Sequence, residues 1–162
     1  MAPSVEFLAQ PFDASTTAGS ALVAMLDDPA IVEITIVVAW ARFRGLARIR
    51  EPLSRFRARG GTATTVVGID EGGATAPGLK AACDRFDAAY IFHDDNQRTF
   101  HPKIYLGQGA ATAVLLVGSS NLTPGGLFSN YEASTRFTFD LPDEAGHVAL
   151  TGALASIRRR TG

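Results

Sequence analysis

The sequence predicts an α/β domain whose mixed β-sheet is flanked by helices on both faces. In the first half of the chain, short runs rich in Ile and Val alternate with amphipathic helical stretches. In the second half, strand-like segments follow one another directly. Strands separated by helices favour parallel pairing and directly connected strands favour antiparallel pairing, so both kinds of pairing are expected in one sheet.

The first half contains four expected strands and three expected helices. The apolar or β-branched runs that indicate strands are Ser4–Gln10, Ile31–Ala39, Thr62–Ile69 and Ala89–His93. The stretches that indicate helices are Ser15–Asp28, Arg42–Arg59 and Pro77–Phe86. Gly45 and Pro52 suggest that the second helix is in two pieces.

The second half is expected to form a hairpin, one further strand and a final helix. Phe100–Leu106 and Thr112–Val117 are the predicted hairpin strands, joined by a loop at Gly107–Ala110. A loop over Ser119–Asn130 and a strand over Tyr131–Phe139 follow, and a helix is expected from Pro142 to about Arg159.

Composition restricts the class of protein. The 162 residues, 46% hydrophobic with a net charge of −1, fit a single domain over 1–162 and exclude intrinsic disorder. Cys83 has no second cysteine to pair with, which favours a reducing, cytoplasmic location. The run Ile31–Trp40 is interrupted by Glu33 and is about half as long as a membrane span, so no membrane partner is expected. The last helix has no clear C-cap, so the sequence is also compatible with an N-terminal domain that continues into a longer chain.

Three polar motifs follow one another late in the chain. His101-Pro102-Lys103 places an imidazole and an ammonium two residues apart on a predicted strand, so both point to one face. Gly118-Ser119-Ser120-Asn121 offers hydroxyl, amide and backbone donors at a strand end, where an anion can bind. Glu132 begins the next strand, where its carboxylate is able to accept a hydrogen bond from His101 Nδ1.

Each motif alone has a plainer interpretation. A single histidine near a lysine occurs often by chance, a Gly-Ser-Ser-Asn segment is usually a turn or a helix N-cap, and a lone glutamate is usually a solvated charge. The order and spacing of all three favour the catalytic interpretation.

These motifs resemble the signature of the phospholipase D superfamily: H-x-K, then an Asp, then G-S/T-x-N and a later Glu. The chain reads His101-Pro102-Lys103 and Gly118-Ser119-Ser120-Asn121, and Glu132 follows Asn121 by eleven residues. Gln108 stands where the usual motif has its Asp, and the hairpin loop is longer than usual. Both departures are similar to the metal-independent restriction endonucleases that carry a phospholipase D-type catalytic domain.

The resemblance implies a phospholipase D/nuclease-like fold and a phosphodiesterase that works through a phosphohistidine. His101 would attack phosphorus, and Glu132 would orient it. Lys103, Ser119 and Asn121 would hold the non-bridging oxygens, and a second histidine would protonate the leaving oxygen. No metal and no cofactor is implied, and Asp94-Asp95, the nearest pair of acids, is expected to be a solvated turn.

One motif supplies only one of the two histidines that this mechanism needs. His93 and His147 lack a neighbouring Lys and Asn, so they are interpreted as structural or surface residues. Single-motif members of the superfamily dimerise with one active site at the two-fold interface. A homodimer is therefore expected, in which His101 faces its own copy.

An arginine-rich segment bears on the substrate. Seven arginines between Arg42 and Arg59 accompany a single acid, Glu51. Arg42, Arg44 and Arg48 are candidate contacts to a nucleic-acid backbone, while a solvated amphipathic helix is the equally weighted alternative. The favoured function is a restriction-type endonuclease acting on DNA. The alternatives are a phospholipid-directed phosphodiesterase and a non-catalytic nucleic-acid-binding module with the same fold.

Overall fold

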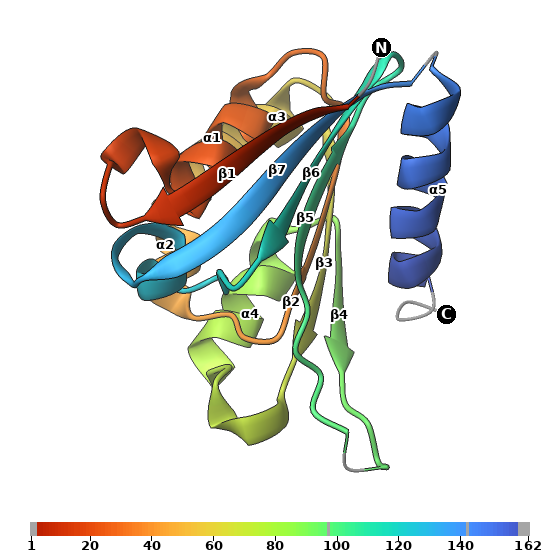
Figure 1. Ribbon diagram of the computed structural model, residues 1–162. Helices are drawn as coiled ribbons and strands as arrows, with labels where there is room; N and C mark the ends of the chain where they lie inside the picture. The colour runs from red at the N-terminus through yellow and green to blue at the C-terminus, as the bar shows by residue number, and fades with distance from the viewer. Residues whose placement is uncertain (1–2, 97, 142, 159–162) are drawn as a thin grey trace.

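The computed structural model describes residues 3–96, 98–141 and 143–158. Within these ranges the chain forms one seven-stranded sheet with helices on both faces (Figure 1). The strands are β1 (Ser4–Gln10), β2 (Glu33–Val38), β3 (Thr62–Gly68), β4 (Ala88–Phe92), β5 (Lys103–Gln108), β6 (Thr112–Gly118) and β7 (Glu132–Asp140). The helices are α1 (Ala18–Asp27), α2 (Phe43–Arg48), α3 (Arg50–Ala58), α4 (Ala76–Arg85) and α5 (Glu144–Arg158), with short helical turns η1 (Ala14–Thr16), η2 (Asp70–Gly72) and η3 (Gly125–Ser129).

The sheet is mixed, as expected, with the strand order β1-β7-β6-β5-β2-β3-β4. β2, β3 and β4 are parallel, and every other neighbouring pair is antiparallel. The end of β2 therefore lies beside the start of β5, where Val38 is opposite Lys103. The end of β6 and the start of β7 lie at the same edge, where Gly118 is opposite Ser134. This topology gathers the sequence motifs at one edge of the sheet.

The second half of strand β2 is buried on both faces, which explains the consecutive apolar residues Ile36, Val37 and Val38. Ile36 and Val38 pack into the core beneath helices α1–α4, whereas Val37 packs into the second core on the opposite face. A segment between two layers needs no polar face, so the sequence does not alternate over these three residues. Helix α5 covers the second face and contributes Leu150 to that core (Figure 1).

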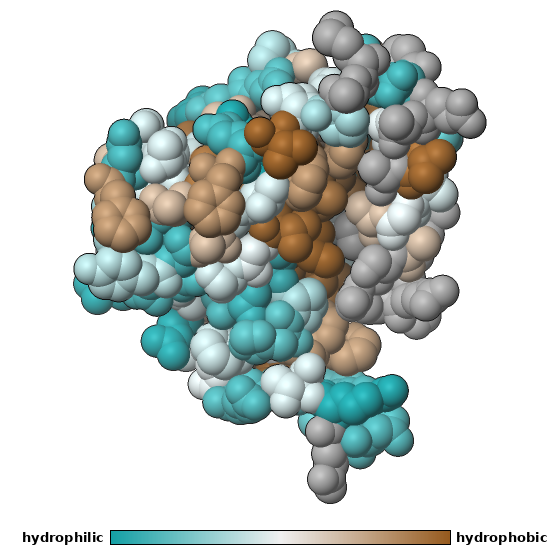
Figure 2. Space-filling view, in the orientation of Figure 1, coloured by the Kyte–Doolittle hydropathy of each residue, from teal (hydrophilic) through white to brown (hydrophobic). Residues whose placement is uncertain are grey.

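The second face is only partly covered by α5. Val5 lies opposite Phe137 and so shares its face, yet Val5 and Phe7 are largely exposed. Figure 2 shows hydrophobic surface gathered between the sheet and α5. The apolar surface of this face thus extends beyond the helix that packs on it.

The expected helix over Arg42–Arg59 is broken at a different residue from those suggested by the sequence. Gly45 lies inside α2 and Pro52 lies in the first turn of α3, where its missing N–H removes no helical hydrogen bond. The break is at Ile49, whose non-helical backbone lets its side chain enter the core.

Three boundaries in the second half also differ from expectation. β5 starts at Lys103, so His101 precedes the strand. The strand does not begin earlier because Pro102 has no N–H to donate to a neighbouring strand. The Pro102 carbonyl still accepts a hydrogen bond from Ala39 N at 2.9 Å. Gly107 and Gln108 belong to β5, which shortens the hairpin loop. The expected loop after Ser119 contains the helical turn η3. Pro142 and Arg159, the expected ends of the last helix, lie outside the described residues.

No helix in the described part of the chain is long and apolar enough to cross a membrane.

Gly45 should be required for the close packing of α2 against the segment after β6. A Cβ at this position would overlap the carbonyl oxygen and carbon of Leu122, both backbone atoms. We expect Gly45→Ala to lower the free energy of unfolding by about 1–3 kcal/mol, because the backbone has to shift. Thermal and urea unfolding measure the change.

Gly152→Ala is the matched control, because a Cβ there meets nothing within 4 Å and the residue lies in α5. Its higher helix propensity should raise the free energy of unfolding by about 0.5–1 kcal/mol. A Gly45→Ala protein as stable as the wild type would contradict the packing argument.

Candidate active site

A buried lysine in contact with a histidine lies at the centre of the candidate site. Lys103, the first residue of β5, is buried, and its Nζ lies 2.7 Å from His101 Nδ1 and 2.9 Å from His101 O. Desolvation by burial lowers the pKa of Lys103, while the charges of Glu132 and Glu71 act in the opposite direction. The predicted pairing of His101 with Lys103 therefore occurs, although His101 itself is outside the strand.

The partner of His101 Nδ1 differs from expectation. Glu132 was expected to accept a hydrogen bond from this atom, but Nδ1 faces Lys103 Nζ instead. A charged lysine donates to Nδ1, so a neutral His101 ring carries its proton on Nε2. Glu132 instead accepts hydrogen bonds from the Ser119 hydroxyl and from Asn130 Nδ2.

Ser119 is held against the start of β7. Its hydroxyl donates to Glu132 and accepts from Ala133 N at 3.1 Å, and its own N–H donates to Ala133 O at 3.0 Å. Its hydroxyl hydrogen is therefore engaged by a carboxylate, rather than directed at an anion.

Asn121 is anchored through its carbonyl oxygen. Oδ1 accepts from the backbone N–H of Trp40 at 3.1 Å, and the side chain is buried. No described residue accepts a hydrogen bond from Nδ2, so its two N–H groups remain available as donors on a side chain that Trp40 N anchors. Such donors are suited to holding phosphate oxygens.

Trp40 connects these groups, although no sequence motif singled it out. Its ring contacts the His101 ring edge-on with centroids 5.5 Å apart, and Lys103 Nζ lies 6.0 Å from its centroid. Its Nε1 donates to Asp70 O at 3.3 Å. A usable signal existed, because Trp40 and Asp70 follow adjacent parallel strands, whose carboxyl ends meet at the same edge.

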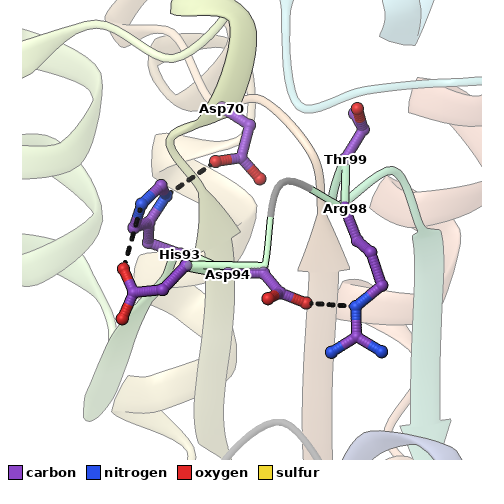
Figure 3. Close-up of a pocket in the computed structure, with 6 residues that line it drawn as sticks. Asp70, His93, Asp94, Arg98 and Thr99 are labelled. Carbon is purple, nitrogen blue, oxygen red and sulfur yellow. Dashed lines mark hydrogen bonds and ion pairs between the residues drawn. The ribbon is translucent and has the colours of Figure 1, made fainter.

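Asp70 fixes the segment that leads into His101. Its carboxylate accepts from Phe100 N at 3.1 Å and contacts His93 Nδ1 at 2.8 Å (Figure 3). The Phe100 hydrogen bond, followed by that of His93, lowers the pKa of Asp70. The hydrogen bond with Asp70 is also the main cause that raises the pKa of His93. The structural role expected for His93 is thus that of an anchor for the segment before the site.

Tyr105 supports the strand end from beneath. Its hydroxyl donates to Ser120 O at 2.8 Å inside the core, and full burial raises the pKa of this phenol. The hydroxyl therefore remains a donor and holds the backbone between Ser119 and Asn121.

Gln108 lies far from these groups. It ends β5, opposite Ala113 and Glu33, at the other end of the strand from Lys103. Five residues of extended strand separate the two positions by roughly 17 Å. The residue at the usual Asp position therefore does not contact the histidine and lysine.

The arginines divide into two groups. Arg55 forms an ion pair with Asp27 at 2.9 Å, and Arg57 forms one with Asp87. Arg59 donates hydrogen bonds to backbone carbonyls that include Ile31 O. These three arginines connect the α3 region to neighbouring segments. Arg42 and Arg44 instead lie beside the candidate site and line a groove there. Arg48 lies over the Phe128 ring at 5.6 Å. Contacts within the fold thus account for Arg55, Arg57 and Arg59, whereas a nucleic-acid contact by Arg42, Arg44 and Arg48 stays a prediction.

Asp94 and Asp95 occupy a polar turn, as expected. Asp94 accepts from Asn96 N and Arg98 Nε, and Asp95 contacts His93 (Figure 3). Across residues 3–96, 98–141 and 143–158, no group of three or more His, Cys, Asp or Glu is placed to hold a metal ion.

Comparison with known proteins identifies the fold. No protein-family model matches the sequence, and no curated protein matches it significantly. NucT from Helicobacter pylori is similar in structure, with a TM-score of 0.65 and 12% identity over 94% of this chain and 92% of that chain. The phospholipase D family member Nuc from Salmonella typhimurium gives a TM-score of 0.63 and 18% identity over 93% and 91% of the two chains.

Phosphatidylserine synthase from Haemophilus influenzae gives a TM-score of 0.69 and 14% identity, covering 98% of this chain but 39% of that chain. These identities establish likeness of fold and do not distinguish between branches of the superfamily. The predicted mixed sheet flanked by helices is confirmed, and the chain has the fold of the phospholipase D superfamily.

Proposed function

We propose that the protein is a phosphodiesterase that cleaves DNA without a metal ion, as a restriction-type endonuclease, through a phosphohistidine formed at a homodimer interface. The observation that carries the proposal is the buried Lys103 ammonium in contact with His101. Asn121, which Trp40 N anchors at the same edge of the sheet, adds amide donors. A lysine and an amide supply positive potential and hydrogen bonds to the oxygens of a phosphodiester.

The reaction proceeds in two displacements. His101 Nε2 of one copy attacks phosphorus, an N–P bond forms, and the bond to the leaving oxygen breaks while the partner histidine gives that oxygen a proton. Water then attacks phosphorus and gives its proton to the partner histidine, and the N–P bond breaks. Covalent attack divides a difficult displacement into two easier ones. Lys103 and Asn121 hold the non-bridging oxygens in both steps.

The contact between Lys103 and His101 describes the site without substrate. A ring that accepts from the ammonium at Nδ1 carries its proton on Nε2 and cannot attack from that atom. For the attack, Lys103 Nζ leaves Nδ1 for a phosphate oxygen and the ring carries its proton on Nδ1, while the partner ring acts as the acid in its imidazolium form.

An exposed aromatic pair beside Glu132 supports the homodimer. Tyr131 is 81% exposed, Phe12 is 77% exposed, and their ring centroids lie 5.8 Å apart. Apolar surface next to an incomplete site is suited to contact with a second copy, because an isologous interface pairs the same patch with itself. Within the chain, His93 is held by Asp70 and His147 lies on α5, so neither supplies the second imidazole.

The arginines at the site edge support a nucleic-acid substrate over a phospholipid. Arg42 and Arg44 lie next to the segment that carries Asn121, where a guanidinium is able to bind a flanking phosphate. The distant position of Gln108 supports activity without the usual motif Asp, since that residue does not contact the site.

Removal of His101 should abolish cleavage. We expect wild-type protein to cut DNA in excess EDTA, and His101→Ala to lose activity by about 10³-fold or more, because the covalent step is removed. His147→Ala, on exposed α5, is the matched control and should cut normally. Strict dependence on Mg²⁺, or full activity of His101→Ala, would contradict the proposal.

Mixed dimers distinguish a shared site from independent sites. If both histidines of a dimer serve one site, co-refolding equal amounts of wild type and His101→Ala leaves about a quarter of the wild-type activity per total protein, because only wild-type pairs work. Independent subunits would leave about half. Light scattering should give twice the 17.1 kDa chain mass, and an active monomer would contradict the shared site.

Asp70 should position His101 for catalysis. Asp70→Ala removes both side-chain acceptor oxygens, including the one that holds Phe100 N, so kcat should fall by about 10-fold while KM changes little. His93→Gln leaves the Phe100 hydrogen bond in place and should have a smaller effect. Equal losses in kcat and stability across both variants would show a merely structural role.

The His93–Asp70 pair also predicts a pH dependence of stability. The raised pKa of His93 means that its stabilisation is fully present below the unfolded pKa, about 6.5, and is lost as pH rises through the folded value. Asp70, with a lowered pKa, remains ionised throughout that window. The urea midpoint of His93→Gln should therefore fall below that of wild type at mildly acid pH and match it at alkaline pH.

A further inference from the structure

A groove lies beside the candidate site, at the start of α2. Its cavity volume is about 800 Å³, within the range of small-ligand sites. Residues that line it include Arg42, Phe43 and Arg44 on one side and Thr123 and Asn130 on the other. No acidic residue is among its described lining residues.

The groove is continuous with the site. Arg42 N donates to Leu122 O at 3.1 Å, directly after Asn121. Asn130 lines the groove and also donates to Glu132 at 3.4 Å. Phe43 follows Trp40 by three residues, which span at most about 10 Å. The groove thus borders the segments that carry Asn121 and Glu132.

Phe43 is placed as a stacking surface. Its side chain is at the N-terminal end of α2 and is 49% exposed. The Arg85 guanidinium lies 5.3 Å from its ring centroid and lines the neighbouring hollow, not the groove. This cation–π contact holds the ring from one side and leaves the face toward the groove available.

The two arginines differ in how they are held. Arg42 Nε donates to Gly73 O at 3.2 Å, which fixes its guanidinium at the groove wall. Arg44 is exposed and has no hydrogen bond or ion pair with any residue the structure describes. An aromatic platform between cations is the combination that binds single-stranded nucleic acid, by base stacking and phosphate contact.

We propose that this groove binds an unpaired nucleotide adjacent to the phosphodiester being cleaved, with its base stacked on Phe43 and its phosphate held by Arg44. The inference rests on the proposed function and gives it a substrate preference: a strand that is single or locally opened at the site. Stacking is tolerant of base identity, so the groove selects for strand accessibility rather than for one sequence.

Binding to a non-cleaving protein tests the groove. Fluorescence anisotropy of a labelled short single-stranded DNA is measured with His101→Ala and with the same protein carrying Phe43→Ala. We expect Phe43→Ala to weaken binding about 10-fold and Phe43→Tyr to retain it, because one base–aromatic stack is lost or kept. Tyr90→Ala removes a side chain of similar exposure, 42%, on edge strand β4 and should bind as the parent does.

Salt and strand form give independent readouts. Arg44→Gln should reduce the slope of log binding constant against log salt concentration by about 1, the value expected for the loss of one phosphate contact. Equal affinity of Phe43→Ala and its parent, both confirmed as folded by their melting temperatures, would overturn the groove. The groove would also be overturned if duplex DNA bound as tightly as the single strand and Phe43→Ala did not weaken that binding.

The two proposals fail in different ways. Phe43-dependent binding by a protein that cuts no DNA would refute the proposed function and leave the groove standing. Metal-free cleavage of DNA together with Phe43-independent binding would leave the proposed function standing and refute the groove.

Discussion

The hydrogen bond from the Trp40 backbone to the Asn121 side chain closes the site, and the other groups depend on it. β2 and β6 are not neighbours in the sheet, because β5 lies between them. Beyond the strand ends, however, Trp40 N reaches Asn121 Oδ1, and Ala41 forms a bridge with Leu122. The two segments thus meet across the start of β5. This crossing fixes the amide donors and places the Trp40 ring against His101.

A buried ammonium at this crossing constrains its surroundings. Burial disfavours the charged form of Lys103, and the carboxylates of Glu132 and Glu71 act against that effect. Glu132 is therefore useful to the site without touching His101, because it supports the charge beside that ring. Its hydrogen bonds from Ser119 and Asn130 hold the carboxylate in place. The electrostatic balance of Lys103 thus accounts for the glutamate that the sequence pattern singled out.

The sequence predicted the elements better than the contacts between them. Apolar runs such as that of β2 indicate burial on both faces, so the strands and their approximate bounds could be predicted from the sequence. Pairing of the parallel and antiparallel halves brought the motif residues to one edge. The partner of His101 Nδ1 could not be predicted from the sequence, because a ring nitrogen has several possible polar neighbours and only the folded geometry determines which one it contacts. Asp70 was also missed, since its role depends on a backbone N–H, which no sequence pattern records.

The surface around Glu132 is divided between two kinds of contact. Tyr131, which precedes Glu132, forms an exposed aromatic pair with Phe12. Asn130, which donates to Glu132, lines the groove with Arg42 and Arg44. Apolar surface favours a second protein copy, and cationic surface favours a phosphate backbone. The proposed dimer contact and the proposed substrate contact therefore involve different residues, so the two need not compete for the same surface.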